Sequence, residues 1–382
     1  MYFWYFVQIL IGYNLVLPLL LYLFYLCSSE SIVKNNNKAI TYDYAIIVTA
    51  YKQTELLPAV IDSILKIDYK NYLVYVVADN CDISDLHFED DRVILLRPDV
   101  ILANNVKSHF HAIKNFRRNH DILTIIDSDN LVKYDYLTQL NLYFDQGYEA
   151  VQGVRKSKEL LSTLAALDAA RDYYYHFYDG EVLFRIGSSS TLAGSGMAFT
   201  ASLYKDCLGN TVSEGAGFDK ILQAQLVLRH KRIAFAKEAI VYDEKTANSE
   251  QLVNQRARWI NTWFKYLGYG IKILINGITT FNRNSFIFGF ILLRPPLFIF
   301  LILSVIFLII NIFIQPILAI FWLIAIGIFI LSFYIALIKG QADKKIYQSL
   351  KNIPKFIFLQ VISLFYARKA NKKSIATTHI IK

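Results

Sequence analysis

Residues 122–130, with the sequence ILTIIDSDN, decide the fold predicted for this chain. Aliphatic and β-branched residues fill the run from Ile122 to Ile126, which is typical of a central strand buried on both faces of a sheet. Two carboxylates, Asp127 and Asp129, follow this strand at once. Because ligands gather at the carboxyl ends of parallel strands in α/β sheets, we expect these two acids to lie beside a ligand.

The two carboxylates need a positive partner in that position. Like charges this close disfavour each other's ionisation, and burying them without a cation is unfavourable. A divalent metal ion that also holds a diphosphate would remove the repulsion. The competing interpretation is an Asx turn that only closes the strand, and the motif by itself does not decide between the two.

Composition and charge point to a membrane protein. The 382 residues are 55% hydrophobic, above the usual range of soluble domains. Lys and Arg outnumber Asp and Glu by 40 to 31, and the whole excess lies between Lys339 and Lys382. This indicates a basic tail at an anionic membrane surface, and not a nucleic-acid-binding fold. The scattered cysteines Cys27, Cys81 and Cys207 favour neither a zinc site nor a disulfide framework.

Two parts of the chain are long and apolar enough to cross a membrane. Residues 1–29 carry no charge and lack both a basic start and a cleavage site, which predicts a transmembrane anchor and not a signal peptide. Residues 297–338 are also uncharged and, at roughly 60 Å of helix, predict two crossings that turn at Gln315 and Pro316. By the positive-inside rule, we expect a multi-pass protein of the plasma or inner membrane whose central domain is cytoplasmic.

Between these parts the pattern indicates an α/β sheet. The expected order before the opening stretch is strand, helix, strand, strand and helix, at residues 44–51, 54–66, 72–79, 92–97 and 106–118. This alternation predicts a doubly wound, mostly parallel sheet. A helix around 133–146, a strand at 149–154 and a long helix around 157–180 are expected next. No GxGxxG or P-loop sequence occurs, so dinucleotide and P-loop sites are not supported.

Two later segments carry polar features in an apolar context. Gly194, Ser195 and Gly196 interrupt an apolar strand pattern, where glycine permits a tight turn or the close approach of a ligand, with a plain bulge as the alternative. Asp219 lies in the first turn of a predicted helix, where a simple capping role is the alternative.

A further predicted helix, starting near residue 249, carries the sequence QRARW. Its polar and aromatic members are Gln255, Arg256, Arg258 and Trp259. Such a cluster fits a binding site, and the alternative is an interfacial helix with Trp at the headgroups and Arg reaching outward to water.

Six short motifs of the chain can be listed in sequence order. They are IVTAYKQTE, VVADN, IDSDN, AGSGM, GFDK and QRARW. In these motifs, which cover about residues 42–265, the chain resembles the membrane-bound family-two glycosyltransferases, the inverting enzymes that include cellulose, chitin, hyaluronan and poly-N-acetylglucosamine synthases. The resemblance implies a GT-A fold, which is Rossmann-like and doubly wound, together with transmembrane helices. It also implies an enzyme that transfers a sugar from a nucleotide-sugar donor, here expected to be UDP-linked.

The resemblance assigns a donor site residue by residue. The base and ribose would be held by Thr49, Ala50, Tyr51 and Glu55. Asp79 would accept a hydrogen bond from the uracil N–H, and Lys107 would contact the diphosphate. Asp127, Ser128 and Asp129 match the DxD motif, with Asp129 as the direct ligand of Mg²⁺ or Mn²⁺ and Asp127 nearer the ribose. The metal would stabilise the charge that builds on the departing nucleoside diphosphate.

The resemblance also assigns the catalytic base and the acceptor site. Asp219 matches the base that deprotonates the acceptor hydroxyl. The family has Glu-Asp where this chain has Phe218 and Asp219, so Glu214 is a rival candidate. The residues that would bind the acceptor are Gly194, Ser195, Gly196 and Trp259. Those that would contact the donor are Gln255, Arg256 and Arg258, because a planar guanidinium fits a phosphate.

These assignments divide the chain into five expected parts. They are a transmembrane helix at 1–29, a cytoplasmic GT-A domain at 40–257, interfacial helices at 258–296, two transmembrane helices at 297–338 and a basic cytoplasmic tail at 339–382. The tail contains a predicted amphipathic helix at 355–366, too short to span a bilayer.

The expected acceptor is a growing polysaccharide or a lipid-linked glycan. Transfer of a single sugar to a lipid carrier or lipid is the first alternative, and an inactive membrane protein that binds a nucleotide-sugar is the second. Two crossings after the catalytic domain cannot alone enclose a polysaccharide channel. If the enzyme adds several sugars to one acceptor, then either an export or assembly partner is present, or copies of the chain associate as a homo-oligomer, or the products stay short.

Overall fold

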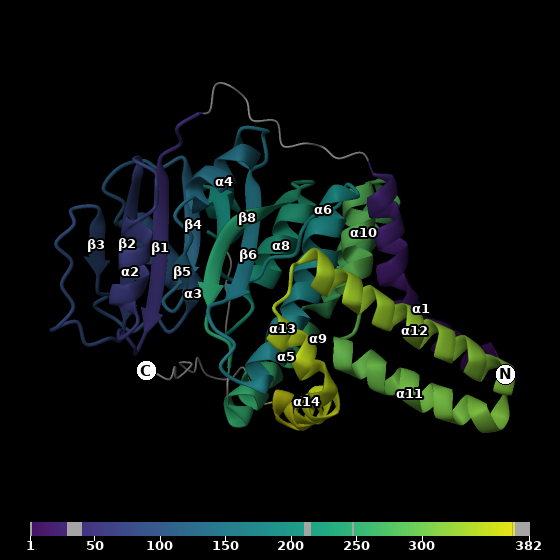
Figure 1. Cartoon of the computed structure of the whole chain (residues 1–382). Helices are drawn as coiled ribbons and strands as arrows, with labels where there is room; N and C mark the ends of the chain where they lie inside the picture. Colours follow the sequence, from purple (N-terminus) through teal and green to yellow (C-terminus); the bar gives the residue numbers. More distant parts are fainter. Residues whose placement is uncertain (1, 29–39, 210–214, 247, 369, 371–382) are drawn as a thin grey trace. The chain divides into compact units, whose positions relative to one another are not determined.

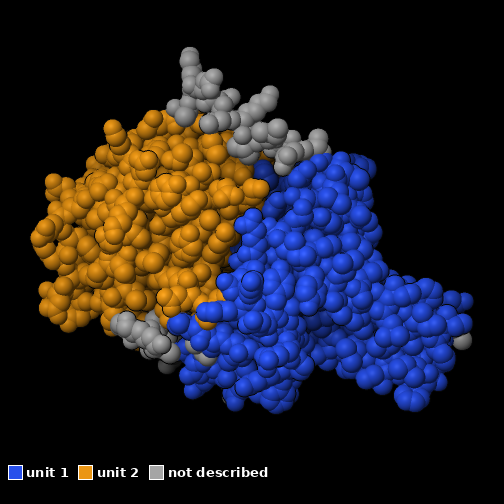
Figure 2. All heavy atoms as spheres, viewed as in Figure 1, with its two compact units in different colours: residues 1–31, 161–188, 247–368 blue, residues 32–160, 189–246, 369–382 orange. Residues whose placement is uncertain are grey.

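The computed structural model describes residues 2–28, 40–209, 215–246, 248–368 and 370. The chain separates into two compact units, coloured blue and orange in Figure 2. Unit 1 consists of residues Met1–Ser31, Leu161–Ser188 and Ala247–Arg368. Unit 2 consists of residues Ile32–Leu160, Ser189–Thr246 and Lys369–Lys382.

Unit 2 is built around one mixed sheet, which has eight strands among the described residues (Figure 1). Their order across the sheet is β3-β2-β1-β4-β7-β6-β8-β5. The strands are β1 Tyr44–Tyr51, β2 Tyr72–Asp79, β3 Val93–Leu96, β4 Ile122–Asp127, β5 Leu131–Val132, β6 Ala150–Ser157, β7 Met197–Thr200 and β8 Ile233–Asp243. β1 pairs in parallel with β2 and β4, β2 with β3, and β6 with β8, whereas β7 and β5 pair antiparallel with their neighbours.

The helices of unit 2 lie where the sequence predicts helices, except α7, which the sequence analysis did not predict. They are α2 Leu57–Leu65, α3 Asn105–Lys114, α4 Tyr136–Phe144, α7 Ala201–Leu208 and α8 Phe218–Leu228. The central strands are buried because Val, Ile and Leu face both layers; every residue of β4 before Asp127 is at most 1% exposed. The mostly parallel α/β sheet predicted from the sequence is confirmed.

Two elements differ from the expected pattern. The helix expected around 157–180 begins at Thr163, because the Ser162 hydroxyl caps it by accepting the Ala165 N–H. This helix, α5 Thr163–Tyr175, continues as the π-helix η1 His176–Val182 and α6 Leu183–Arg185, all within unit 1.

The strand expected to contain the AGSG sequence is shorter than the run of apolar residues around that sequence. β7 starts only at Met197, because Gly194 and Gly196 have φ angles of 88° and 67°, which a strand cannot accommodate. The three residues of the Gly-Ser-Gly sequence therefore form a loop that leads into the sheet.

Unit 1 is helical throughout the residues described. Besides α5, η1 and α6, its helices are α1 Tyr2–Cys27, α9 Ser249–Thr279, α10 Arg283–Leu292, α11 Leu297–Ile314, α12 Pro316–Lys339, α13 Lys344–Ser349, η2 Leu350–Asn352 and α14 Ile353–Ala367. Three of these, α1, α11 and α12, are long and apolar enough to cross a membrane, which is compatible with membrane association. The turn between α11 and α12 falls at Gln315, as expected.

Hydrogen bonds join these three apolar helices to one another. The Gln8 side-chain oxygen on α1 accepts from Asn311 Nδ2 on α11 at 2.6 Å and from Trp322 Nε1 on α12 at 2.7 Å. All three side chains are buried among apolar neighbours. In a bilayer a hydrogen bond between helices contributes about 1 kcal/mol, so this group helps fix which faces of the helices meet.

Two glycines allow α9 and α10 to pack backbone against backbone. A Cβ added to Gly277 on α9 would overlap the backbone nitrogen of Phe286 on α10, and one added to Gly289 would overlap the backbone of Leu274. Gly268, also on α9, faces open space, with nothing within 4 Å of the position its Cβ would take. The helix therefore has glycine both where packing requires it and where packing does not.

We predict opposite effects for the same substitution at these two positions of α9. Gly277→Ala should destabilise unit 1 by about 1–3 kcal/mol, because a rigid backbone must move to admit the methyl group. Gly268→Ala should be neutral or stabilising by up to about 1 kcal/mol, the difference in helix propensity. Thermal unfolding of the purified variants in detergent measures both, and equal stability of the two would contradict the close crossing.

Candidate active site

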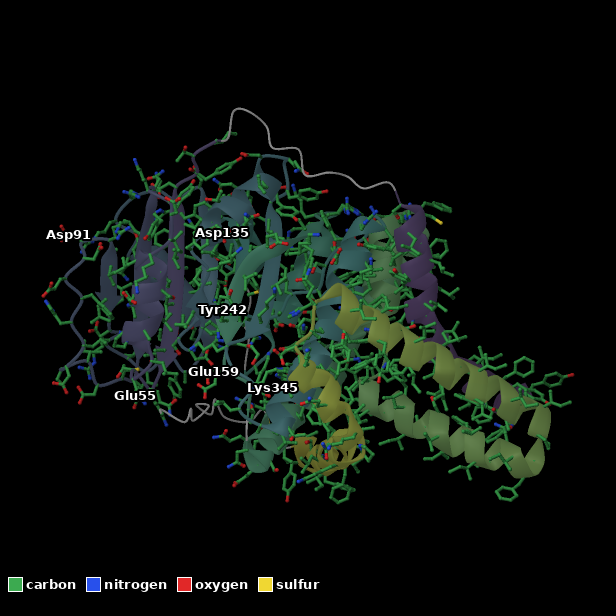
Figure 3. All side chains as sticks on the ribbon, in the orientation of Figure 1. Glu55, Asp91, Asp135, Glu159, Tyr242 and Lys345 are labelled. Carbon is green, nitrogen blue, oxygen red and sulfur yellow. The ribbon has the colours of Figure 1, made fainter. Side chains whose placement is uncertain are left out.

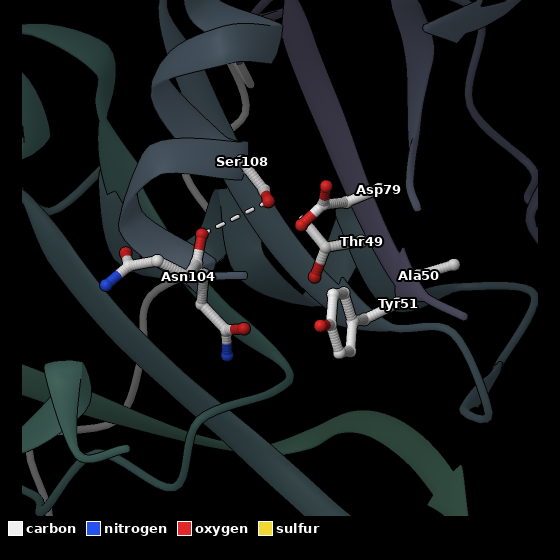
Figure 4. Close-up of a pocket in the computed structure, with 7 residues that line it drawn as sticks. Thr49, Ala50, Tyr51, Asp79, Asn104 and Ser108 are labelled. Carbon is white, nitrogen blue, oxygen red and sulfur yellow. Dashed lines mark hydrogen bonds between the residues drawn. The ribbon is translucent and has the colours of Figure 1, made fainter. Parts of the chain in front are cut away.

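The carboxyl ends of three neighbouring strands form the candidate donor site in unit 2. Parallel register pairs Tyr51 at the end of β1 with Asp79 at the end of β2, and pairs Thr49 with Asp127 of β4. A pocket opens at this edge beside the start of α3 (Figure 4). It is lined by Thr49, Ala50, Tyr51, Asp79, Asn104, Asn105 and Ser108.

The pocket brings together four of the residues assigned from the sequence to the base and ribose. The fifth, Glu55, is exposed in the turn before α2 and is not among the lining residues (Figure 3). Lys107 is also exposed, one turn into α3. The sequence analysis did not single out Asn104, although an Asn-Asn pair ahead of a helical pattern is a capping signal. Asn104 indeed caps α3 by accepting the Lys107 N–H at 3.0 Å.

Of the DxD residues, Asp127 ends β4, and Ser128 and Asp129 follow directly. Asp127, Ser128 and Asp129 are each partly exposed. The backbone N–H of Asp127 donates to Ser195 Oγ at 3.1 Å, and Lys158 Nζ donates to the backbone carbonyl of Asp129 at 2.8 Å. These bonds hold the backbone at both ends of the motif.

The surroundings of Asp127 favour its protonated form. Removal from water is the largest cause, and the neighbouring Asp129 carboxylate the second, of a rise in the pKa of this carboxyl to about 6. The Arg155 guanidinium opposes the shift, and the more distant Asp243 and Asp219 add to it. No hydrogen-bond donor among the described residues contacts the Asp127 carboxylate. Negative charge at this position is therefore incompletely balanced by the protein.

An ion-pair group that the sequence analysis missed lies near these acids. Asp243, at the end of β8, is 2% exposed and accepts from Arg155 Nη2 at 2.7 Å and from Lys245 Nζ at 2.9 Å. No local signal reveals this group, because Arg155 and Asp243 meet only through the pairing of β6 with β8, 88 residues apart in the chain. Arg155 is thus held in place close enough to the DxD motif to act electrostatically on the Asp127 carboxyl.

Side chains hold the backbone of the loop at residues 192–196. Arg155 Nη1 donates to the carbonyl of Ala193 at 2.8 Å. Buried Gln152 accepts the Ala193 N–H at 2.9 Å and donates to the Ser195 carbonyl at 3.1 Å. Ser195 is fully buried, and its hydroxyl supports the end of β4, so the acceptor role implied for Gly194, Ser195 and Gly196 stays a prediction.

Asp219 lies in the first turn of α8, as the sequence predicts. Its Oδ2 forms an ion pair with Lys220 Nζ at 3.0 Å, and Lys220 also donates to the carbonyl of Leu192 at 2.8 Å. Gly217 precedes the helix with a φ of 99°, a conformation that favours glycine. The rival base, Glu214, lies outside the described residues.

The QRARW residues Gln255, Arg256, Arg258 and Trp259 belong to α9 in unit 1. Arg256 is 2% exposed and forms an ion pair with Asp168 of α5. Burial and the nearby Arg171 lower the pKa of Arg256 to about 10. The Arg256 and Arg171 guanidinium carbons lie 4.1 and 4.3 Å from the centroid of the Trp259 ring. The sequence analysis missed both Asp168 and Arg171.

Comparison with known proteins identifies a family that this chain matches. Residues 42–262 match the model of the family described as "Glycosyltransferase like family 2". Among curated proteins, no similar sequence was found.

The solved structures that are similar to this chain include the following two. Mannosyltransferase PcManGT from Pyrobaculum calidifontis, in complex with GDP-Man and Mn²⁺, is 14% identical with a TM-score of 0.52, over 87% of this chain and 99% of that chain. S. aureus TarS 1–349 in complex with UDP-GlcNAc is also 14% identical, with a TM-score of 0.44, over 86% of this chain and 90% of that chain.

The family match covers more than half of the 382 residues, including both carboxylates of the DxD motif and the whole of QRARW. The likeness to PcManGT supports the same fold. The chain therefore belongs to glycosyltransferase family 2, and it is a GT-A-fold glycosyltransferase that takes its sugar from a nucleotide-sugar.

Proposed function

We propose that this enzyme transfers a sugar from a UDP-linked donor to a carbohydrate or lipid-linked acceptor, with inversion and with the help of a divalent cation, at the cytoplasmic face of a membrane. The observation that carries the proposal is the edge of the sheet in unit 2. There the pocket at the ends of β1 and β2 lies beside the two DxD carboxylates after β4. PcManGT, which has this fold, is described with GDP-Man and Mn²⁺.

Asp127 and Asp129 fit Mg²⁺ or Mn²⁺. The Asp127 carboxyl has a raised pKa and no donor among the described residues, and hard cations prefer oxygen ligands of this kind. In the described part of the chain, no three His, Cys, Asp or Glu side chains are grouped to hold a metal ion by themselves. The donor diphosphate and water would thus complete the shell. When bound, the cation would offset the charge on the departing nucleoside diphosphate.

Asp219 would act as the general base. Its Oδ2 is engaged by Lys220, whereas Oδ1 has no partner among the described residues and can accept the proton of an acceptor hydroxyl. A single displacement assisted by one base inverts the anomeric configuration. Glu214 remains the rival for this role.

Unit 1 would supply the membrane anchor and further polar contacts. Within the described residues, Nε and Nη1 of buried Arg256 have no acceptor, which supports the diphosphate role implied for this side chain. Trp259 is 39% exposed, so part of its ring can contact an acceptor sugar. In this proposal α1, α11 and α12 cross the membrane, and residues 40–257 form the cytoplasmic catalytic domain.

Two variants should separate donor binding from transfer. Asp129→Ala should abolish Mn²⁺-dependent donor binding and turnover, because it removes the proposed metal ligand. Asp219→Asn should keep donor binding but slow transfer by about 10²-fold or more, the usual contribution of a general base. Calorimetric titration with UDP-sugars and release of UDP by purified membranes measure the two steps.

The controls test the assignment directly. EDTA should abolish wild-type turnover, and added Mn²⁺ or Mg²⁺ should restore it. Full activity in EDTA would refute the metal role. Normal transfer by Asp219→Asn together with loss of transfer by Glu214→Gln would move the base to Glu214.

The raised pKa of Asp127 predicts a pH dependence of metal binding. Below about pH 6 a proton occupies this carboxyl and competes with the cation, whereas above it the carboxylate is free. Mn²⁺ affinity in the presence of UDP-glucose, whose diphosphate diester does not titrate in this range, should fall about tenfold from pH 7.5 to pH 5. Electron paramagnetic resonance of free Mn²⁺ measures it, and equal affinity at both pH values would contradict the shift.

Topology can be tested with single cysteines in a Cys27→Ser background, because Cys27 is exposed whereas Cys81 and Cys207 are buried. Gln315→Cys should react with an impermeant maleimide on intact cells. Lys351→Cys, in η2, should react only after permeabilisation. The reverse pattern would place the catalytic domain on the outer side.

A further inference from the structure

Lys220 contacts Asp219 although adjacent positions on a helix do not face each other. Both residues lie in the first turn of α8, one position apart, so about 100° of rotation about the helix axis separates their side chains. Nevertheless Lys220 Nζ lies 3.0 Å from Asp219 Oδ2. The helix alone does not bring these two groups together, so the ion pair needs a cause outside α8.

The backbone carbonyl of Leu192 provides that cause. Lys220 Nζ donates to this carbonyl at 2.8 Å, so the ammonium group bridges α8 and the loop at residues 192–196. Leu192 is 1% exposed, and its own N–H donates to the Gln223 side chain, one turn further along α8, at 3.1 Å. Leu192 is thus bound through both its N–H and its carbonyl, and the carbonyl that Lys220 contacts has a defined position.

The next residue of the loop is held from the sheet and not by Lys220. The carbonyl of Ala193 accepts from Arg155 Nη1 at 2.8 Å, and the N–H of Ala193 donates to buried Gln152 at 2.9 Å. Both of these side chains belong to β6. The loop therefore keeps most of its attachments when Lys220 is replaced, so a variant at this position can be tested in a folded protein.

Asp219 has no competing contact among the described residues. The N-cap of α8 is Gly217, which has no side chain to cap the helix, and no described backbone N–H donates to the Asp219 carboxylate. The simple capping role considered from the sequence is therefore not supported. The side chain is 15% exposed, and Lys220 is the described residue that holds its Oδ2. A carboxylate with one oxygen held has the other oxygen left, in a defined direction, to accept a proton.

We propose that Lys220 is a positioning residue for Asp219: its ammonium group, anchored on the Leu192 carbonyl, holds Oδ2 so that Oδ1 faces the acceptor hydroxyl. This role rests on the base function proposed above for Asp219. During transfer the hydroxyl proton passes to Oδ1, whereas Lys220 keeps its own protons and contacts no substrate. Because Lys220 acts through Asp219 alone, its contribution to the rate exists only while residue 219 is a carboxylate.

A double-mutant cycle in the full-length protein tests this dependence. UDP release from UDP-GlcNAc, and in parallel from UDP-glucose, is measured in native membranes with Mn²⁺ for the wild type, Lys220→Met, Asp219→Asn and the double variant. Lys220→Met should lower kcat roughly tenfold or more, as expected for loss of a hydrogen bond to a charged group, and leave the donor KM unchanged. In the Asp219→Asn background the same change should have no further effect, because no base is left to position.

Three further variants control for charge and for folding. Lys220→Arg should restore most of kcat, because a guanidinium can donate to a carboxylate and to a carbonyl at once. Lys237→Met removes an exposed lysine of β8 and should leave kcat unaltered. Thermal unfolding in detergent shows whether Lys220→Met is folded. If it is not, Lys220→Gln, which keeps an N–H donor without the charge, takes its place in the cycle.

The outcomes are distinct. If Lys220→Met lowers kcat by the same factor in both backgrounds, Lys220 acts independently of Asp219 and the positioning role is wrong. An unchanged kcat, or a raised donor KM with normal kcat, overturns it equally. If instead Asp219→Asn transfers normally, the base function of Asp219 is wrong and the role of Lys220 falls with it. Failure of the wild-type protein to release UDP from either donor would count against the proposed donor class.

Discussion

Repulsion between carboxylates at the end of a buried strand is the constraint around which the catalytic unit is arranged. Asp127 ends β4, and the five residues of β4 before it are buried, with Thr124 as the one polar side chain among them. The nearby positive groups are already used: Arg155 and Lys245 bind Asp243, and Lys158 binds the carbonyl of Asp129. These contacts hold the surrounding backbone and Asp243 in place, but they do not neutralise the Asp127 carboxylate. Negative charge is therefore left at the position where a cation and a diphosphate would supply its balance.

Hydrogen bonds in the same region link β4 to α8. Ser195 accepts the N–H of Asp127, while Gln223 and Lys220 of α8 bind the N–H and the carbonyl of Leu192, at the other end of the same short loop. Gly196 makes this path possible, because a Cβ there would meet Val241 at 3.1 Å and its φ is 67°. Hydrogen bonds at both ends of this loop therefore connect the end of β4 to the first two turns of α8.

The parts of this molecule that could be predicted from its sequence are those that depend on local pattern. Buried strands that end in polar residues were identified because apolar runs and the following acids are neighbours in the chain. The Arg155–Asp243 pair and the Gln152 network could not be found, since they exist only after β6 pairs with β8 and β7. The boundary at Ser162 was missed for a different reason. A helical apolar period continues on both sides of that residue, and only a capping hydrogen bond shows where the helix starts.

The QRARW sequence illustrates why a motif alone does not assign a role. In α9, buried Arg256 has a structural role, because its ion pair with Asp168 joins α9 to α5 within unit 1. A single carboxylate cannot satisfy a guanidinium, and the N–H groups left over at Nε and Nη1 are buried without acceptors in the described residues. Each such group destabilises the protein by about 1–3 kcal/mol until an acceptor arrives. An anionic ligand that reached these groups would be bound more tightly for that reason, and its binding would stabilise the packing of α5 against α9.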